Sequence, residues 1–120
     1  MDELYLIAAE SYARTNDIAH AMDMLNSLLI TRWKTGTFVP FSASTKEEAL
    51  QIIKEERRKE LLFRGLRWAD IKRYNRDGHA ITLTRTIGGE AYTLPPNDPR
   101  YAIAIPEDII KQTGMPQNPR

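Results

Sequence analysis

The sequence predicts a mainly α protein with a tetratricopeptide-like helical hairpin and a long charged helix, followed by a small β-hairpin and an irregular C-terminal tail. Apolar residues recur at helical spacing as far as Asn75. From His79 onward, β-branched residues alternate and Gly and Pro interrupt the chain. A length of 120 residues suits one domain. We divide it into a hairpin (1–32), a loop (33–44), helical segments (45–77) and a β-hairpin with tail (78–120).

The helical hairpin is expected over residues 3–14 and 18–29. Asn16 and Asp17 break the pattern, and Asp17 is suited to cap the second helix. The first helix is expected to pack through the side that carries Leu4, Ile7, Ala8 and Ser11 or Tyr12. Small and bulky residues follow the order of a tetratricopeptide motif: Ala9, Tyr12, Ile18, Ala21 and Leu25. Any tight helical hairpin selects small residues where its helices cross, so the hairpin by itself does not identify a repeat protein.

The third helix is expected to begin at Thr45, which forms a capping box with Glu48, and to continue to Gly65. Projection at 100° per residue places two glutamates, Glu56 and Glu60, inside its apolar stripe. The stripe itself consists of Ala49, Ile52, Ile53 and Phe63, while Lys54, Glu55, Arg58 and Lys59 face the opposite way.

Two interpretations of these glutamates remain open. They are either the acid and base of a glycosidase or part of a metal site, or they belong to a buried ion-pair network. The network is favoured because an apolar interface requires a partner for each carboxylate and the sequence has no Glu-x-x-His element and no cysteine. We therefore expect no metal, no cofactor and no catalysis. The predicted structural network comprises Glu56, Arg57, Glu60, Arg67, Asp70 and Arg73.

The fourth helical segment, residues 66–77, should bury Trp68 as a core residue over the helical hairpin. Gly88 and Gly89 then mark the turn of a β-hairpin. A short helix is expected to open at Pro106 and to run to Lys111 or Gln112, because Pro and acidic residues favour a first helical turn.

The charge balance excludes a strong nucleic-acid binder. The chain has 17 Lys and Arg against 16 Asp and Glu, and its basic residues between 54 and 76 lie among acids that can pair with them. The sequence contains no apolar run long enough for a transmembrane helix and no signal-peptide pattern. Either the protein is cytoplasmic or the chain is a piece of a longer protein.

The loop at residues 33–44 carries three aromatic residues, Trp33, Phe38 and Phe41. Aromatic rings in a loop either pack onto the nearest helices or stay exposed, where their faces can stack on sugar rings. These three residues are the candidate ligand contacts in the chain.

Taken together, several segments resemble the C-terminal region of the SusD/RagB family. The resemblance is carried by YLIAAESYART, by Glu56-Arg57-Arg58 with Glu60, Gly65, Arg67-Trp68, Asp70 and Arg73, by PPNDPR, by AIPEDII and by the terminal QNP. Leu29 departs from the family, which often has arginine there. The chain also stops at Arg120, where the family commonly has an aromatic residue soon after QNP.

The resemblance implies a non-catalytic, surface-exposed outer-membrane lipoprotein of Bacteroidetes that serves nutrient uptake and polysaccharide utilisation. Such proteins bind an oligosaccharide or another nutrient over a SusC-like TonB-dependent transporter. Family members are several times longer and carry their lipid-accepting cysteine and most ligand contacts upstream. This chain is therefore expected to be a C-terminal region. The alternative is a stand-alone tetratricopeptide-like module that binds a peptide.

Overall fold

The computed structural model describes residues 1–119. It is mainly helical, and its described residues contain one two-stranded antiparallel sheet, as the sequence predicts. The chain divides into two compact units, Met1–Gly65 and a second that begins at Leu66.

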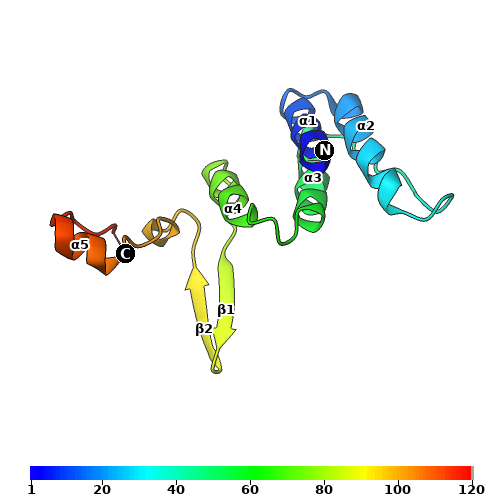
Figure 1. Ribbon diagram of the computed structural model, residues 1–120. Coiled ribbons are helices and arrows are strands. Elements are labelled where there is room, and N and C mark those ends of the chain that lie inside the picture. Colours follow the sequence, from blue (N-terminus) through cyan, green and yellow to red (C-terminus); the bar gives the residue numbers. More distant parts are fainter. Residues whose placement is uncertain (120) are drawn as a thin grey trace. The chain divides into compact units, whose positions relative to one another are not determined.

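The first unit consists of three α-helices and a short 3-10 helix (Figure 1). The α-helices are α1 (Asp2–Arg14), α2 (Ile18–Leu29) and α3 (Lys46–Glu60), and the 3-10 helix η1 (Ile30–Arg32) follows α2 directly. Helix α1 packs against both α2 and α3. The core of this unit is made by Leu6, Ala9, Ala13, Ala21, Leu25, Leu28, Leu29, Ala49 and Ile53.

The α1–α2 turn forms as the sequence predicts. Asn16 adopts a positive φ of 67°, which asparagine tolerates better than most residues. The side chain of Asp17 then caps α2 by accepting a hydrogen bond from the backbone N–H of His20. Ala9 and Ala21 are completely buried, so small side chains do lie where the helices pack.

The predicted packing face of α1 is wrong. The helix buries Leu6, Ala9, Glu10 and Ala13, whereas Leu4 is 64% exposed and Ile7 is 49% exposed. Because α1 contacts α2 and α3 together, its buried arc is centred between these two neighbours. Leu4 and Ile7 fall outside that arc.

Helix α3 begins as expected and ends earlier than expected. Thr45 Oγ1 accepts a hydrogen bond from the backbone N–H of Glu48, and the Glu48 carboxylate accepts one from the N–H of Ser44. The helix stops at Glu60, and Phe63 has a φ of 61° and a 99% exposed side chain. The assignment of Phe63 to the apolar stripe is therefore wrong, because that stripe does not extend past the end of the helix.

The second unit contains α4 (Arg67–Arg76), the strands β1 (Leu83–Ile87) and β2 (Glu90–Leu94), the 3-10 helix η2 (Pro99–Tyr101) and α5 (Glu107–Thr113) (Figure 1). Strands β1 and β2 pair in register from Leu83 with Leu94 to Ile87 with Glu90. Gly88 and Gly89 both have positive φ, as a two-residue turn matched to the strand twist requires.

The prediction that Trp68 is a core residue is also wrong. Its side chain is 38% exposed, although its ring packs against Tyr101 with a centroid separation of 4.9 Å. Trp68 lies in the first turn of α4, and the buried residues of this helix begin at Asp70. Tyr101 is itself buried and supports the indole ring.

Three irregular segments are held by side-chain amides that bond both the N–H and the C=O of one backbone residue. We call these contacts amide clips. Asn26 clips Phe41, Asn75 clips Ile81, and Gln117 clips Ile105, with all six distances between 2.6 and 3.0 Å. An amide group matches a backbone peptide because it offers a donor and an acceptor side by side.

Within residues 1–119, every helix is too short or too polar to cross a lipid bilayer.

Candidate functional site

The predicted ion-pair residues of α3 are Glu56, Arg57 and Glu60. They lie near the C-terminal end of the helix, beside the basic residues of its last turn. Arg57 is buried, and its Nη2 lies 2.9 Å from Glu3 Oε1 at the start of α1. This contact joins residues 54 positions apart in the sequence. It ties α3 to α1 through a largely shielded guanidinium, whose long apolar stem also packs inside the unit.

Glu60 is paired with an arginine outside the predicted set. Arg32, in η1, donates to Glu60 through Nε at 3.0 Å and through Nη2 at 2.7 Å, so the contact is forked. Arg32 Nη2 also lies 3.2 Å from Asp2. These contacts raise the pKa of Arg32, chiefly through the hydrogen bond to Glu60. The guanidinium stays charged and connects all three α-helical regions of the unit.

Glu56 is shielded from water as expected, but its partner, Lys59, lies outside the predicted network. The Glu56 side chain is 10% exposed and accepts a hydrogen bond from Nζ of Lys59. Lys54 and Lys59 were both expected to point away from the apolar stripe. This is wrong for Lys54, which is buried, whereas the side chain of Lys59 is 67% exposed. The long lysine stem allows the ammonium group to reach back to the carboxylate while water still solvates it.

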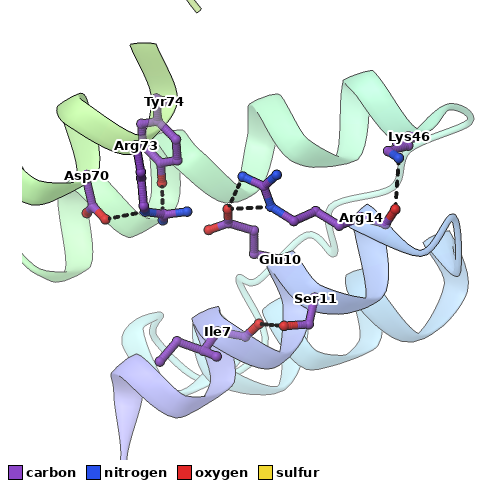
Figure 2. A network of polar contacts seen from close by, with 8 residues as sticks. All are labelled: Ile7, Glu10, Ser11, Arg14, Lys46, Asp70, Arg73 and Tyr74. Carbon is purple, nitrogen blue, oxygen red and sulfur yellow. Dashed lines mark hydrogen bonds and ion pairs between the residues drawn. The ribbon is translucent and has the colours of Figure 1, made fainter. Parts of the chain in front are cut away.

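Two further clusters of polar contacts lie on α1 and on α4 (Figure 2). On α1, Arg14 donates to the buried Glu10 at 2.8 and 2.9 Å, and Lys46 donates to the carbonyl of Arg14. On α4, Arg73 donates to Asp70 at 2.9 Å and to the hydroxyl of Tyr74 at 2.8 Å. The Arg73 guanidinium also lies 4.2 Å from the centre of the Tyr74 ring. Arg67, the remaining predicted member, is half-buried at the start of α4.

This chemistry does not resemble a hydrolytic site. A glycosidase needs two carboxyl groups on either side of a sugar, in a cleft that admits the substrate. Glu56 and Glu60 instead accept hydrogen bonds from Lys59 and Arg32. Across the part of the chain that the structure describes, no three His, Asp or Glu side chains are grouped so that they can hold a metal ion.

The loop aromatics form a candidate contact surface in the first unit. Trp33 is 52% exposed, and its ring lies 6.1 Å from that of Phe38 at a tilt of 58°. Phe41 is half-buried, and its backbone is held on α2 by the Asn26 amide clip at 2.8 Å on both sides. The structure thus brings Trp33 and Phe38 together and uses Phe41 as the anchor of the loop.

Sequence reasoning missed Asn26, Arg32 and Glu3. Asn26 lies in a helix where an asparagine disfavours helix formation, and that cost is a signal for a specific side-chain role. Arg32 and Glu3 carry no local signal, because their partners lie 28 and 54 residues away.

Comparison with known proteins identifies the class of protein. A sequence-family model described as the SusD family matches residues 1–119. The chain therefore belongs to the SusD family.

Among solved structures, the chain is similar to a SusD-like protein from Bacteroides fragilis, with 24% sequence identity and a TM-score of 0.65. The match covers 98% of this chain and 24% of that protein, so the chain spans about a quarter of the length of its structural relative. This likeness supports the fold. No curated protein matches the chain.

Proposed function

We propose that this chain is the C-terminal part of a non-catalytic nutrient-binding protein of the bacterial outer membrane. Its nutrient is an oligosaccharide, and its partner is a SusC-like TonB-dependent transporter. The protein is held at the cell surface by a lipid anchor upstream of this region. The observation that carries the proposal is the SusD family match over residues 1–119.

The aromatic pair of the first unit, an exposed Trp33 and a half-buried Phe38, supports a role in sugar contact. Trp33 and Phe38 offer apolar ring faces on a loop whose base is fixed by the Asn26 amide clip. A pre-positioned aromatic surface loses little conformational entropy when it binds. The surface consists of few residues, so we expect a dissociation constant near 1 mM, which corresponds to about −4 kcal/mol.

Tryptophan fluorescence tests this contact directly. In Trp68→Phe, which retains Trp33, one or more members of a panel of neutral oligosaccharides should quench the emission. In Trp33→Phe, which retains Trp68, the same titration should leave the emission unchanged. Quenching in Trp33→Phe alone would show that saccharides contact Trp68 rather than Trp33. No response to any saccharide would contradict the proposed binding.

The absence of catalysis is tested with the same panel. Incubation of the purified chain with each oligosaccharide should release no new reducing ends. Turnover that disappears in Glu56→Gln would establish a hydrolase and overturn the non-catalytic assignment.

A second candidate function is a peptide-binding module of tetratricopeptide type. The exposed apolar residues Leu4 and Ile7 on α1 favour it, since such a surface is suited to cover an amphipathic helix. Under this alternative, Leu4→Ser with Ile7→Ser should abolish capture of a partner protein while leaving the Trp33 response to saccharides unchanged.

A further inference from the structure

The geometry points to an additional binding site in the second unit, for the carboxylate or sulfate groups of an acidic oligosaccharide. The site is a hollow of about 510 Å³ between one face of α4 and the turn that precedes η2. Its volume falls in the range of roughly 300–1,000 Å³ that is common for small-molecule sites. That the anion is carried by a saccharide rests on the proposed function.

The cationic wall of this hollow comes from α4. Lys72, Arg73 and Arg76 line it, and since Lys72 and Arg73 lie four and three residues before Arg76, each is a neighbour of Arg76 on the helix surface. Ala69 continues the same face one turn earlier and leaves room for a ligand because its side chain is small. The buried residues Ile71 and Tyr74 occupy a different face of α4.

Lys72 and Arg76 have unused hydrogen-bonding capacity. Both side chains are exposed, and neither takes part in a hydrogen bond or ion pair among residues 1–119. Arg73 differs from them, because it is held by Asp70 and by the Tyr74 hydroxyl. Its charge is partly balanced by Asp70, whereas the charges of Lys72 and Arg76 face the hollow without a partner.

The opposite wall is made by the PPNDPR segment, which the ion-pair network does not involve. Asn97 has a φ of 59°, and its side-chain amide lies 3.4 Å from the carbonyl of Asn75 on α4. Asp98 caps η2 by accepting from the N–H of Arg100, and it also binds the Arg100 guanidinium through both oxygens at 2.8 Å. This segment is therefore held in place before any ligand arrives.

The Asp98–Arg100 pair determines the sign of the net charge in the hollow. Asp98 is the one acidic residue that lines the hollow, and the hydrogen bonds from Arg100 lower its pKa to about 2. Its negative charge is matched by Arg100, so it does not cancel Lys72 and Arg76. The hollow keeps a net positive charge, which selects an anion.

The exposed Ala69 and the largely buried Tyr101 form the apolar part of the lining. A ligand that has an apolar ring face as well as a negative group satisfies both parts of this lining. Uronic acids and sulfated sugars combine these two features in one residue. Inorganic anions have only the charge.

The inference is tested on the full chain by NMR titration with three probes: trigalacturonate, maltotriose and inorganic sulfate. Trigalacturonate should shift the backbone amides of residues 69–76 and those of Asn97, Asp98, Arg100 and Tyr101. Maltotriose should leave these amides unmoved, and sulfate should move them only weakly. Raising the salt concentration to about 1 M, where the Debye length is about 3 Å, should suppress the trigalacturonate shifts.

Charge substitutions test whether Lys72 and Arg76 bind the anion. Lys72→Gln with Arg76→Gln should weaken trigalacturonate binding by about tenfold or more, because two charged contacts are lost. The charge-conserving pair Lys72→Arg with Arg76→Lys should retain binding. Arg58→Gln is the matched control, since Arg58 is an exposed cation of the first unit with no bond among the described residues. Equal weakening by Arg58→Gln would show non-specific attraction and would overturn the site.

The remaining outcomes separate this inference from the proposed function. If saccharides quench Trp33 while trigalacturonate leaves residues 69–76 unmoved, the proposed function stands and the second site is refuted. If sulfate moves these residues as strongly as trigalacturonate, the saccharide specificity is refuted. If no saccharide acts on either region, both proposals fail.

Discussion

Arg32 Nη2 lies 2.7 Å from Glu60 Oε1 and joins the end of the α2–η1 segment to the end of α3 across 28 residues of sequence. The same guanidinium reaches Asp2 at the start of α1. One exposed arginine thus holds the three helical segments together at one end of the first unit, where their apolar core gives way to charged residues.

Loss of this contact should loosen the helix ends. Glu60→Gln keeps the shape of the side chain but removes the charge, so it should lower the Tm more than Glu55→Gln does. Glu55 is the matched control because it is exposed and its hydrogen bond, from Gln51, stays within α3. The difference between the two variants should shrink at high salt, which screens exposed ion pairs. Equal Tm values for the two variants at low salt would contradict the role of Glu60.

Arg57 should matter far more than its neighbour in sequence. Arg57→Ala removes a buried guanidinium and leaves Glu3 without that partner, at a cost of up to about 3 kcal/mol because Glu3 is partly hydrated. Arg58→Ala changes an exposed side chain and should cost less than about 0.5 kcal/mol. Urea unfolding of the two variants measures this difference directly. Similar stabilities would show that the Arg57–Glu3 pair contributes little.

The cost of losing Glu56 follows from the exposure of its partner. Glu56→Ala leaves Lys59 in water rather than leaving a buried guanidinium unpaired. We therefore expect a loss of about 1 to 2 kcal/mol, below the 3 to 5 kcal/mol typical when a buried pair is broken. Chemical denaturation of Glu56→Ala beside Lys59→Ala checks this, since Lys59→Ala should cost less than about 1 kcal/mol. A loss above about 3 kcal/mol in Glu56→Ala would refute the assignment to Lys59.

The Asn26 amide clip should control the order of the aromatic loop. Asn26→Ala leaves the N–H and C=O of Phe41 without these bonds and should cost about 1 to 2 kcal/mol. Hydrogen exchange at the Phe41 amide should accelerate, and the fluorescence anisotropy of Trp33 should fall in a Trp68→Phe background. Ser27→Ala, at an exposed neighbouring position, should change neither quantity. Unchanged exchange at Phe41 in Asn26→Ala would show that the loop is held by other contacts.

Asp98 should give the second unit a specific response to acid. The Arg100 guanidinium lowers the pKa of Asp98 to about 2 from its ordinary value of 3.8. Since the folded pKa is the lower one, the stabilisation is present above pH 4 and is lost as the pH falls from about 4 to 2. A carboxyl-carbon NMR titration should give a midpoint near 2, and Arg100→Gln should raise it towards the ordinary value of an aspartate. A midpoint that does not move in Arg100→Gln would contradict the pairing.

The parts of the fold that were predictable are those with local signals. Periodic apolar residues, the Asp17 cap and the Gly88–Gly89 turn each act within a few residues, and each feature forms as expected. The face of α1 was not predictable in the same way. Its apolar residues outnumber the positions that two neighbouring helices can cover, so the sequence alone does not show that Leu4 stays exposed while Leu6 is buried.

The polar partners were harder to predict because they depend on tertiary placement. The shielding of Glu56 and Glu60 follows from their position in the stripe, but Arg32 approaches Glu60 from another segment. Phe63 shows the opposite difficulty. Helical projection assumes a continuous helix, and the positive φ at Phe63, two residues before Gly65, removes the side chain from the face that projection assigns to it.

The three amide clips make this protein sensitive to deamidation. Slow hydrolysis of a side-chain amide turns Asn or Gln into a carboxylate, and such residues are among the thermolabile ones. The product keeps the acceptor but has no donor, so Asn26, Asn75 and Gln117 would each lose the bond to a backbone carbonyl and gain a negative charge. A single chemical lesion at any of them would release the segment that it holds, while the helices that flank it remain folded.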